Sequence, residues 1–311
     1  MRVVFMGTPE FAVVSLNKLL SAGINIVAVV TAPDKPSGRG LKIQQSPIKK
    51  AAQASRLPIL QPEKLSDPDF NINLSHFKPD LIVVVAFRIL PESVFTLPPL
   101  GTINLHGSLL PKYRGAAPIN WAIINGEKET GVTTFFIKKE VDTGNIIDME
   151  KIPISPDMTA GELHDILAQK GADLLHTTLI KIEKGTVRTK KQDDSLASRA
   201  PKINRDDCLI NFDTPVQKVH DFIRGLSPYP AAYTFLNGRR LRLFASRIWD
   251  PVTLKAKPGT LTSISESRRL LIQCNPGIIA IAELQIEGKK RLPVEEFLKG
   301  KRIIAGTVFG E

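Results

Sequence analysis

Cysteine is scarce in this chain of 311 residues. Its two cysteines, Cys208 and Cys274, lie far apart, so they provide neither a disulfide framework nor the short spacing of a metal-ligand motif. Long hydrophobic runs are missing too, since the apolar stretch 81–87 is far shorter than the roughly 20 residues that cross a membrane. The N-terminus reaches Gly7-Thr8-Pro9 too early for a signal peptide. We therefore expect a cytoplasmic protein with no membrane partner.

The motifs of three common site classes are also missing. The first apolar stretch runs into Gly7-Thr8-Pro9 and not into the Gly-x-Gly-x-x-Gly of dinucleotide folds, which argues against NAD-dependent hydride transfer. Asp142-Thr143-Gly144 is the chain's one Asp-Thr-Gly, whereas an aspartic protease needs two carboxylates in its site. We expect no metal, because short paired spacing is absent among His76, His164, His176 and His220.

Positive charge is in excess and is unevenly distributed. The 42 Lys and Arg residues against 31 Asp and Glu give a formal charge of +11. Residues 1–200 account for +4 of it, and the shorter stretch 201–311 accounts for +7. Such an excess indicates a polyanionic partner, with nucleic acid as the first candidate, although many basic proteins bind none.

Short apolar stretches alternate with helical patterns in the N-terminal half. Residues 3–6, 26–30 and 81–87 are continuous apolar stretches typical of buried strands, and residues 10–20 place apolar side chains at helical spacing. This alternation predicts an α/β fold with an open, mostly parallel sheet that is covered on both faces. Because ligands of such sheets bind beyond the carboxyl ends of the strands, we expect a functional site at that edge.

The composition changes after residue 183. Residues 184–205 carry seven basic and two acidic residues with little apolar material, which is typical of an exposed linker. Beyond them, short strand patterns are separated by turns rich in Asn, Gly and Pro; they lie at 232–236, 241–244, 270–273 and 278–284. We predict an α/β domain at 1–187, a basic linker at 188–206 and a small antiparallel barrel or sandwich at 207–311.

One strand of the N-terminal half ends in polar side chains. In Ile103-Asn104-Leu105-His106, the alternation of a strand places Asn104 and His106 together on one face. Gly107 then allows another group to approach the backbone closely, and a loop with Pro and Gly follows. The pattern indicates a site rather than a core.

Several motifs occur in one order along the chain. They are Met6-Gly7-Thr8-Pro9, the loop 33–40, the stretch 104–111 (NLHGSLLP), Arg114-Gly115, Val141-Asp142-Thr143-Gly144, Ile223-Arg224-Gly225 and Pro228-Tyr229-Pro230. With these motifs the chain resembles the methionyl-tRNA formyltransferase family nearly from end to end. The resemblance implies a Rossmann-like formyltransferase fold followed by an OB-like β-barrel that binds tRNA. It also implies that the chain transfers the formyl group of 10-formyltetrahydrofolate to the amino group of methionyl initiator tRNA, in translation initiation.

The implied reaction makes demands that the polar strand end can meet. An amine that attacks a formyl carbonyl passes through a tetrahedral species with negative charge on oxygen and positive charge on nitrogen. Asn104 and His106 can donate hydrogen bonds to that oxygen. A nearby carboxylate can orient the imidazole and relay protons through water, and Asp142 is our candidate, although Asp-Thr-Gly is first of all a common turn sequence. We therefore predict Asn104, His106 and Asp142 as the catalytic residues.

The resemblance places the folate along two segments that follow strands. The predicted folate-binding residues are Phe87, Ile89, Leu90, Ser108, Leu109, Leu110 and Pro111. In the first segment the chain departs from the family, whose members commonly have a small glycine-containing turn before Ile-Leu-Pro. Here the turn is one residue shorter and carries Arg88. We expect this departure to change the local shape of the folate pocket and not the reaction.

Basic residues in two places are predicted to bind tRNA. In the long loop 33–50, Arg39 matches the arginine that in the family engages the acceptor end of the tRNA, and Lys42 lies close to it in sequence. In the second domain, Arg240 and Arg242 share one side of a strand with apolar residues opposite, and Arg247 follows. The spacing of these arginines alone fits a solvent-exposed face of the strand equally well.

Two alternatives stay open. A formyltransferase that acts on an amino sugar nucleotide would share Asn104, His106 and Asp142 and would differ in its acceptor. A basic RNA-binding protein on an inactive folate-binding scaffold would keep the fold without the chemistry, and the complete set of three residues argues against it. The sequence indicates no obligate protein partner.

Overall fold

The computed structural model describes residues 1–37, 42–250, 256–300 and 303–310. The chain forms two compact units, each built from three stretches of sequence. The N-terminal unit comprises Met1–Gly115, Thr130–Ile152 and His164–Ala200, and the C-terminal unit comprises Ala116–Glu129, Pro153–Leu163 and Pro201–Glu311. No single cut in the sequence separates the two units. The bounds 1–187, 188–206 and 207–311 stay a prediction.

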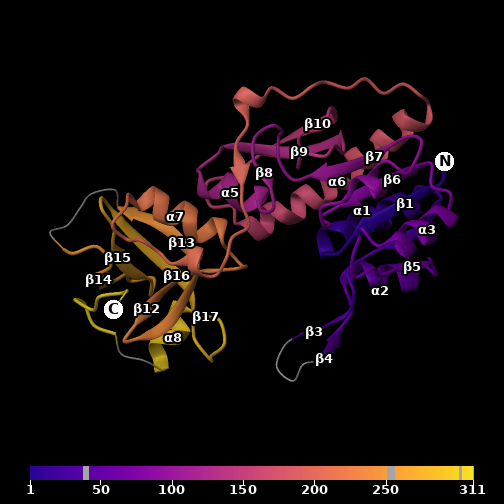
Figure 1. Ribbon diagram of the computed structural model, residues 1–311. Helices are drawn as coiled ribbons and strands as arrows, with labels where there is room; N and C mark the ends of the chain where they lie inside the picture. Colours follow the sequence, from indigo (N-terminus) through magenta and orange to yellow (C-terminus); the bar gives the residue numbers. More distant parts are fainter. Residues whose placement is uncertain (38–41, 251–255, 301–302, 311) are drawn as a thin grey trace. The chain divides into compact units, whose positions relative to one another are not determined.

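A seven-stranded sheet forms the centre of the N-terminal unit (Figure 1). From edge to edge its strands are β10 (Ile146–Pro153), β9 (Glu129–Phe136), β7 (Thr102–His106), β6 (Leu81–Val85), β1 (Val3–Gly7), β2 (Ile26–Val30) and β5 (Ile59–Leu60). The five strands from β7 to β5 are parallel, whereas β9 joins β7 in the antiparallel direction. The predicted mostly parallel sheet is confirmed.

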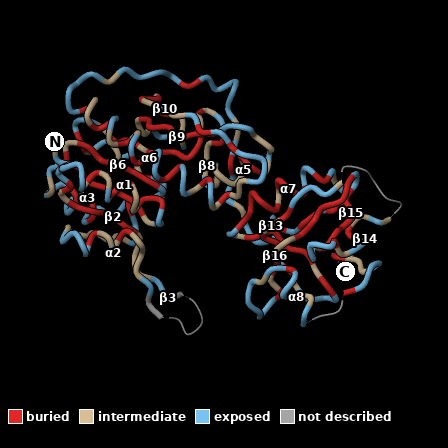
Figure 2. The backbone as a smooth tube through the Cα atoms, turned by 180° about the vertical axis from the view of Figure 1, so that it is seen from behind, coloured by how far each residue is buried: buried red, intermediate tan, exposed pale blue. Residues whose placement is uncertain are grey.

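Burial explains why the central strands are apolar throughout. Every residue of β1 and of β6 is buried, and the tube at the label of β6 is red in Figure 2. Continuous burial of this kind is typical of parallel strands covered on both faces. β6 ends at Val85, two residues before the end of the predicted strand, because Ala86 has a φ of 48°, which does not continue an extended strand.

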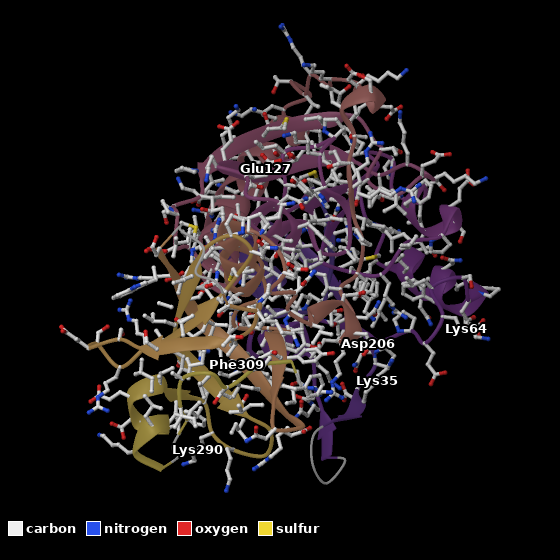
Figure 3. All side chains as sticks on the ribbon, turned by 90° about the vertical axis from the view of Figure 1, so that its left-hand side faces the viewer. Lys35, Lys64, Glu127, Asp206, Lys290 and Phe309 are labelled. Carbon is white, nitrogen blue, oxygen red and sulfur yellow. The ribbon has the colours of Figure 1, made fainter. Side chains whose placement is uncertain are left out.

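Helices and short strand pairs complete the N-terminal unit. Its helices are α1 (Glu10–Ser21), α2 (Pro47–Ala54), α3 (Pro68–His76), α4 (Glu92–Phe95), the 3₁₀ turn η1 (Asp194–Leu196) and α6 (Ala160–Glu183), whose first turn belongs to the C-terminal unit. A hairpin of β3 (Lys35–Ser37) and β4 (Lys42–Gln44) extends away from the sheet in Figure 1, and Figure 3 labels its first residue, Lys35. Far apart in sequence, β8 (Arg114–Gly115) and β11 (Arg199–Ala200) pair in parallel.

The C-terminal unit is built on an antiparallel sheet. Its strands are β12 (Ala232–Leu236), β13 (Arg239–Asp250), β16 (Ile278–Ile286), β15 (Leu270–Gln273) and β14 (Leu261–Ile264) in spatial order, with β17 (Leu292–Pro293) beside β16. The helices are α5 (Pro118–Ile124), η2 (Asp206–Cys208), α7 (Val216–Gly225) and α8 (Val294–Gly300). One face of β13 buries Leu241 and Leu243 against Ile223 of α7 in the core of this unit. The predicted antiparallel β architecture of this part is confirmed.

Within the described residues, no helix is both long enough and apolar enough to span a membrane. The same residues hold no group of three or more His, Cys, Asp or Glu side chains placed to bind a metal ion. Cys208 and Cys274 are free and buried, and burial raises the pKa of the Cys274 thiol to about 12. At neutral pH both cysteines are therefore protonated, apolar parts of the core.

Candidate active site

The carboxyl end of β7 presents two polar side chains on one face of the sheet. Ile103 and Leu105 point into the core and are buried, while Asn104 and His106 alternate with them. β7 lies between β6 and β9, with His106 opposite Thr133 of β9. The strand therefore holds Asn104 and His106 in a fixed register at the edge where ligands of such sheets bind.

His106 is buried, and its two ring nitrogens face different groups. Nε2 lies 2.8 Å from the backbone oxygen of Tyr113. A carbonyl oxygen only accepts hydrogen bonds, so Nε2 carries the hydrogen and donates it. Nδ1 lies 3.7 Å from Oδ2 of Asp142, which is longer than a hydrogen bond but within the distance of an ion pair when the ring carries a second proton. The arrangement leaves Nδ1 as the nitrogen that can take up a proton.

Asp142 lies in the turn between β9 and β10, as the Asp-Thr-Gly sequence predicts. Its backbone has a φ of 56°, a left-handed conformation that is uncommon for residues other than glycine, Asn and Asp. The carboxylate Oδ2 accepts a hydrogen bond of 2.8 Å from the backbone nitrogen of Gly115. Gly115 is required there, because its φ is 125° and a Cβ would lie 2.6 Å from the oxygen of Ala200. The carboxylate that faces His106 is thus fixed from the backbone of β8.

The side chain of Asn104 is half-buried and makes no hydrogen bond within the part of the chain that the structure describes. The other two predicted catalytic residues already have partners. The amide of Asn104 therefore has both donor hydrogens available for a group that approaches the strand end.

A hydrogen-bonded loop follows the strand. The hydroxyl of Thr133 donates to the oxygen of Ser108 at 2.6 Å and accepts from the nitrogen of Leu110 at 3.2 Å. Ser108 donates its own hydroxyl to the oxygen of Lys112 at 2.6 Å. Ser108 and Leu110 are consequently buried, and Leu109 and Pro111 are the half-buried members of the predicted folate-binding stretch. No sequence pattern distinguishes Thr133, which lies in an ordinary strand.

The other predicted folate segment follows β6, whose end is next to the end of β7. Ile89 is 74% exposed, Phe87 is half-buried and Leu90 is buried. Arg88 turns away toward the segment after β5 and donates to the oxygens of Pro62 and Glu63, each at 2.9 Å. Its guanidinium also lies 5.2 Å from the centre of the Phe87 ring, and burial lowers its pKa. The unusual residue of this turn therefore ties the segment to the sheet edge.

Gln192 is a further residue of this site that sequence analysis missed. It lies in the predicted linker, yet it is buried, and its Nε2 donates to the oxygens of Asp142 and Gly144, both at 2.8 Å. Its Oε1 accepts from Nε and Nη2 of Arg114 at 3.1 and 2.7 Å. A single glutamine in a polar stretch gives no periodicity or spacing signal, so no sequence pattern could have singled it out.

The residues predicted to bind tRNA fall into three groups. Arg39 lies outside the described residues, and of Lys42 only the backbone, in β4, is described. On β13, Arg242 and Arg247 are exposed, with Nε of Arg247 4.0 Å from Oδ2 of Asp157. Arg240 is half-buried on the ring of Tyr233, 4.8 Å from its centre, and two of its nitrogens, Nε and Nη1, are buried without a hydrogen-bond partner.

Comparison with known proteins covers the whole chain. A family model described as formyl transferase matches residues 1–179, and one described as formyl transferase, C-terminal domain, matches residues 202–302. The methionyl-tRNA formyltransferase of Ruminiclostridium cellulolyticum is 44% identical over 313 residues, and that of Acetivibrio thermocellus is 43% identical over 312 residues, with 100% of both chains covered in each case. The crystal structure of WlaRD, a sugar 3N-formyl transferase, has a TM-score of 0.67 at 20% identity and covers 93% of this chain and 99% of its own, which shows a shared fold. By its full-length identity to these relatives, the chain belongs to the methionyl-tRNA formyltransferase family.

Proposed function

We propose that this chain transfers the formyl group of 10-formyltetrahydrofolate to the amino group of methionyl initiator tRNA, in translation initiation. The observation that carries the proposal is the pairing of His106 with Asp142 beside the free amide of Asn104, at a strand end of a sheet with this fold. Methionyl-tRNA as the acceptor is supported by the full-length identity of 43–44% to two methionyl-tRNA formyltransferases.

His106 acts as the proton acceptor. Because Nε2 donates to the oxygen of Tyr113, Nδ1 has the free lone pair that takes the proton lost by the attacking amine. The Asp142 carboxylate, 3.7 Å away, stabilises the imidazolium that results. The burial of His106 strengthens this attraction, since few water molecules screen it.

Asn104 stabilises the negative charge on the formyl oxygen. The sequence suggested that Asn104 and His106 donate to this oxygen together. With Nε2 of His106 engaged by a backbone carbonyl, the Asn104 amide is the better donor, because no other group of the described residues competes for it. Asn104 then donates to the formyl oxygen, and His106 takes the proton from the nitrogen of the attacking amine.

The folate carries the formyl group on a nitrogen. As the amine forms its bond to the formyl carbon, the bond from that carbon to the folate nitrogen would break, and the proton held by His106 would pass to the departing folate nitrogen. The segments after β6 and β7 fit such a ligand, because they leave neighbouring strand ends and carry apolar side chains that stay partly exposed, above all Ile89. The residues that would hold the folate are Phe87, Ile89, Leu90, Ser108, Leu109, Leu110 and Pro111. Buried Ser108, Leu110 and Leu90 would shape the walls, and the half-buried and exposed members would contact the ligand.

The tRNA would be held by basic residues, Arg240, Arg242 and Arg247 in the C-terminal unit and Arg39 and Lys42 in the loop 33–50. Exposed guanidinium groups such as those of Arg242 and Arg247 suit a phosphate backbone, because binding releases the counterions of the phosphates.

A test of acceptor range decides between this function and its nearest alternative. The purified chain would receive 10-formyltetrahydrofolate with charged initiator methionyl-tRNA, with the uncharged tRNA or with an amino sugar nucleotide, and formyl transfer would be followed by mass spectrometry. Transfer to charged tRNA alone is expected, and His106→Ala is the inactive control. Transfer to the sugar nucleotide without transfer to charged tRNA would show that the acceptor is wrong, and transfer to neither would favour an inactive scaffold.

A further inference from the structure

A buried glutamine interrupts an otherwise exposed segment. Among residues 184–199, which follow α6 and are mostly pale blue in Figure 2, Gln192 is the one buried residue, at 5% exposure. Burying a polar side chain in a solvated segment is unfavourable unless its hydrogen bonds are made. Both ends of the Gln192 amide have partners, so its burial has a structural reason.

The partners of Gln192 lie in the two segments around the Asp142 carboxylate: backbone oxygens of the turn and the side chain of Arg114 next to Gly115. Its Nε2 donates to the oxygens of Asp142 and Gly144, both at 2.8 Å, on either side of Thr143 in the turn. Its Oε1 accepts from Arg114, the neighbour of the Gly115 nitrogen that donates to Asp142 Oδ2 at 2.8 Å. One side chain thus joins the turn that carries the carboxylate to the strand that binds it.

The turn needs such support. Asp142 has a φ of 56°, and although Asp adopts this left-handed conformation more readily than most residues, it still costs free energy that contacts around the turn must offset. Arg114 is itself fixed, because its Nη2 also donates to Asp194 at 2.7 Å and its backbone nitrogen donates to the oxygen of Ser198 at 2.9 Å. Gln192 therefore joins the turn to a strand that the segment carrying Gln192 also binds through Asp194 and Ser198.

We propose that Gln192 is a positioning residue, which acts through Asp142 by keeping its carboxylate beside Nδ1 of His106. This inference rests on the proposed function, since it assigns Gln192 a part in the same transfer. It gives the predicted linker a role in the chemistry that is exerted through the turn of Asp142.

Gln192→Glu is the sharpest variant. Glutamate keeps the length of the side chain and an oxygen for Arg114, but it has no hydrogen to donate to the oxygens of Asp142 and Gly144. Because a displacement of about 1 Å at a reacting group costs up to about 100-fold, we expect kcat to fall about 10- to 100-fold while the KM values for tRNA and folate stay within about twofold. Leu196→Glu is the matched control, because it adds the same charge to the same segment at an exposed side chain and should leave kcat unchanged.

A double-mutant cycle separates positioning from a general loss of stability. In the Asp142→Ala background, Gln192→Glu should lower kcat by less than about twofold, because the carboxylate that Gln192 positions is gone. If the fold-loss of kcat in the double variant equals the product of the two single losses, the proposal is overturned. A wild-type kcat in Gln192→Glu alone would overturn it too. Thermal melting gives the fraction folded, and Gln192→Met, which has similar length and donates no hydrogen bond, replaces Gln192→Glu if the latter unfolds. Unfolding of both variants would mean that Gln192 is structural, which also overturns the proposal.

A spectroscopic measurement tests Gln192 independently of transfer. With ¹⁵N-labelled histidine the chain gives signals from five residues, and the signals of His106 are assigned by their loss in His106→Gln. Gln192→Glu is expected to shift the Nδ1 signal of His106 in the direction that Asp142→Ala shifts it, and an unchanged signal would overturn the positioning role. If the wild type transfers no formyl group to charged tRNA, the proposed function fails while this spectrum still decides whether Gln192 holds Asp142 beside His106.

Discussion

The end of β7 in the N-terminal unit and the exposed side of β13 in the C-terminal unit use their polar side chains in opposite ways. At the end of β7 in the N-terminal unit, His106, Asp142, Gln192 and Arg114 are bound to one another or to backbone groups. Along β13 in the C-terminal unit, by contrast, Arg242 and Arg247 are exposed, and Nε of Arg247 lies 4.0 Å from Oδ2 of Asp157. Chemistry on a carbonyl needs groups held in place before the substrate arrives, whereas attraction of a phosphate backbone needs only charge of the right sign. A change in the first region should therefore affect turnover, and a change in the second should affect binding and its dependence on salt.

The largest effect is expected at the strand end. Asn104→Ala, His106→Ala and Asp142→Ala should each lower kcat about 100-fold or more, because stabilisation of the oxyanion and proton transfer have effects of that size. The KM for tRNA should change little, since none of these side chains belongs to the basic set. Steady-state kinetics with charged tRNA, together with thermal melts, provide the measurement.

One result would contradict the assignment of catalysis to the end of β7. If two of the three variants keep near-normal kcat while they remain folded, the groups fixed at the end of β7 are not the catalytic ones. Thr133→Ala should be measured beside these variants. It removes the hydroxyl that binds the loop after β7, and it leaves the three predicted catalytic residues unchanged.

A smaller effect, of a different kind, is expected on β13. Replacing Arg240, Arg242 and Arg247 together by Ala should raise the KM for tRNA and make its dependence on salt less steep. With a log–log slope of about 0.7 to 0.9 per phosphate contact, three lost contacts would reduce the slope by about 2 to 3. Affinity for tRNA and kcat would be measured between about 50 and 200 mM salt, with kcat at saturating tRNA expected to stay close to the wild-type value.

The matched control removes the same charge elsewhere. Lys64, Lys139 and Lys170 are exposed residues of the N-terminal unit, and their joint replacement by Ala changes the net charge equally. An equal loss of affinity in both triple variants would point to overall charge rather than to a binding surface on β13. Arg240→Ala alone should also lower stability, because its guanidinium packs on Tyr233.

The smallest effect concerns stability and pH in the C-terminal unit. Burial lowers the pKa of His220, and Arg224 adds to this, while the oxygen of Pro156 and the carboxylates of Asp221 and Asp157 act in the opposite direction. The unfolded chain, with a histidine pKa of about 6.5, then binds a proton that the folded chain does not. Above about pH 6.5, His220 therefore makes its full contribution to the free energy of unfolding. This contribution is lost as the pH falls from there through the lowered pKa of the folded chain.

His220→Gln removes this titration and keeps a group that can hydrogen-bond to Ser246, which lies 2.9 Å from Nδ1 of the wild-type residue. Denaturation with urea at pH 7.5 and pH 5.5 should show a smaller loss of stability in the variant than in the wild type. Equal losses in the two proteins would show that His220 is not responsible. kcat for formyl transfer at pH 7.5 should not change, because His220 is not among the residues predicted to take part in the transfer.

Local patterns in the sequence predicted much of this structure. The apolar runs of β1, β2 and β6 and the alternation at Asn104 and His106 depend on neighbouring residues, so they could be recognised one stretch at a time. The approach of Asp142 to His106 joins residues 36 apart, and it was anticipated through the resemblance to the family and not through spacing. Pairing between distant segments leaves no periodic signal in a single sequence.

Gln192 and Arg88 show where such reasoning ends. Both side chains bind backbone oxygens of distant segments, Gln192 at the Asp142 turn and Arg88 after β5. Every residue has a backbone oxygen, so the residue types of these segments give no sign that they bind Gln192 or Arg88. The end of β6 was missed for a similar reason, because the left-handed conformation of Ala86 is imposed by its surroundings and not by its residue type.

The division of the chain into its two units has a consequence for gene recombination. Residues 116–129 and 153–163 belong to the C-terminal unit, where α5 packs on α7 and Asn120 donates to the oxygen of Gly225 at 2.8 Å. A crossover within the linker would give a chimera whose α5 came from one parent and whose α7 came from the other. Exchange of the basic unit between relatives therefore needs three matched segments, and a library of hybrids joined near residue 206 should yield folded proteins mainly where the parents agree along this helix pair.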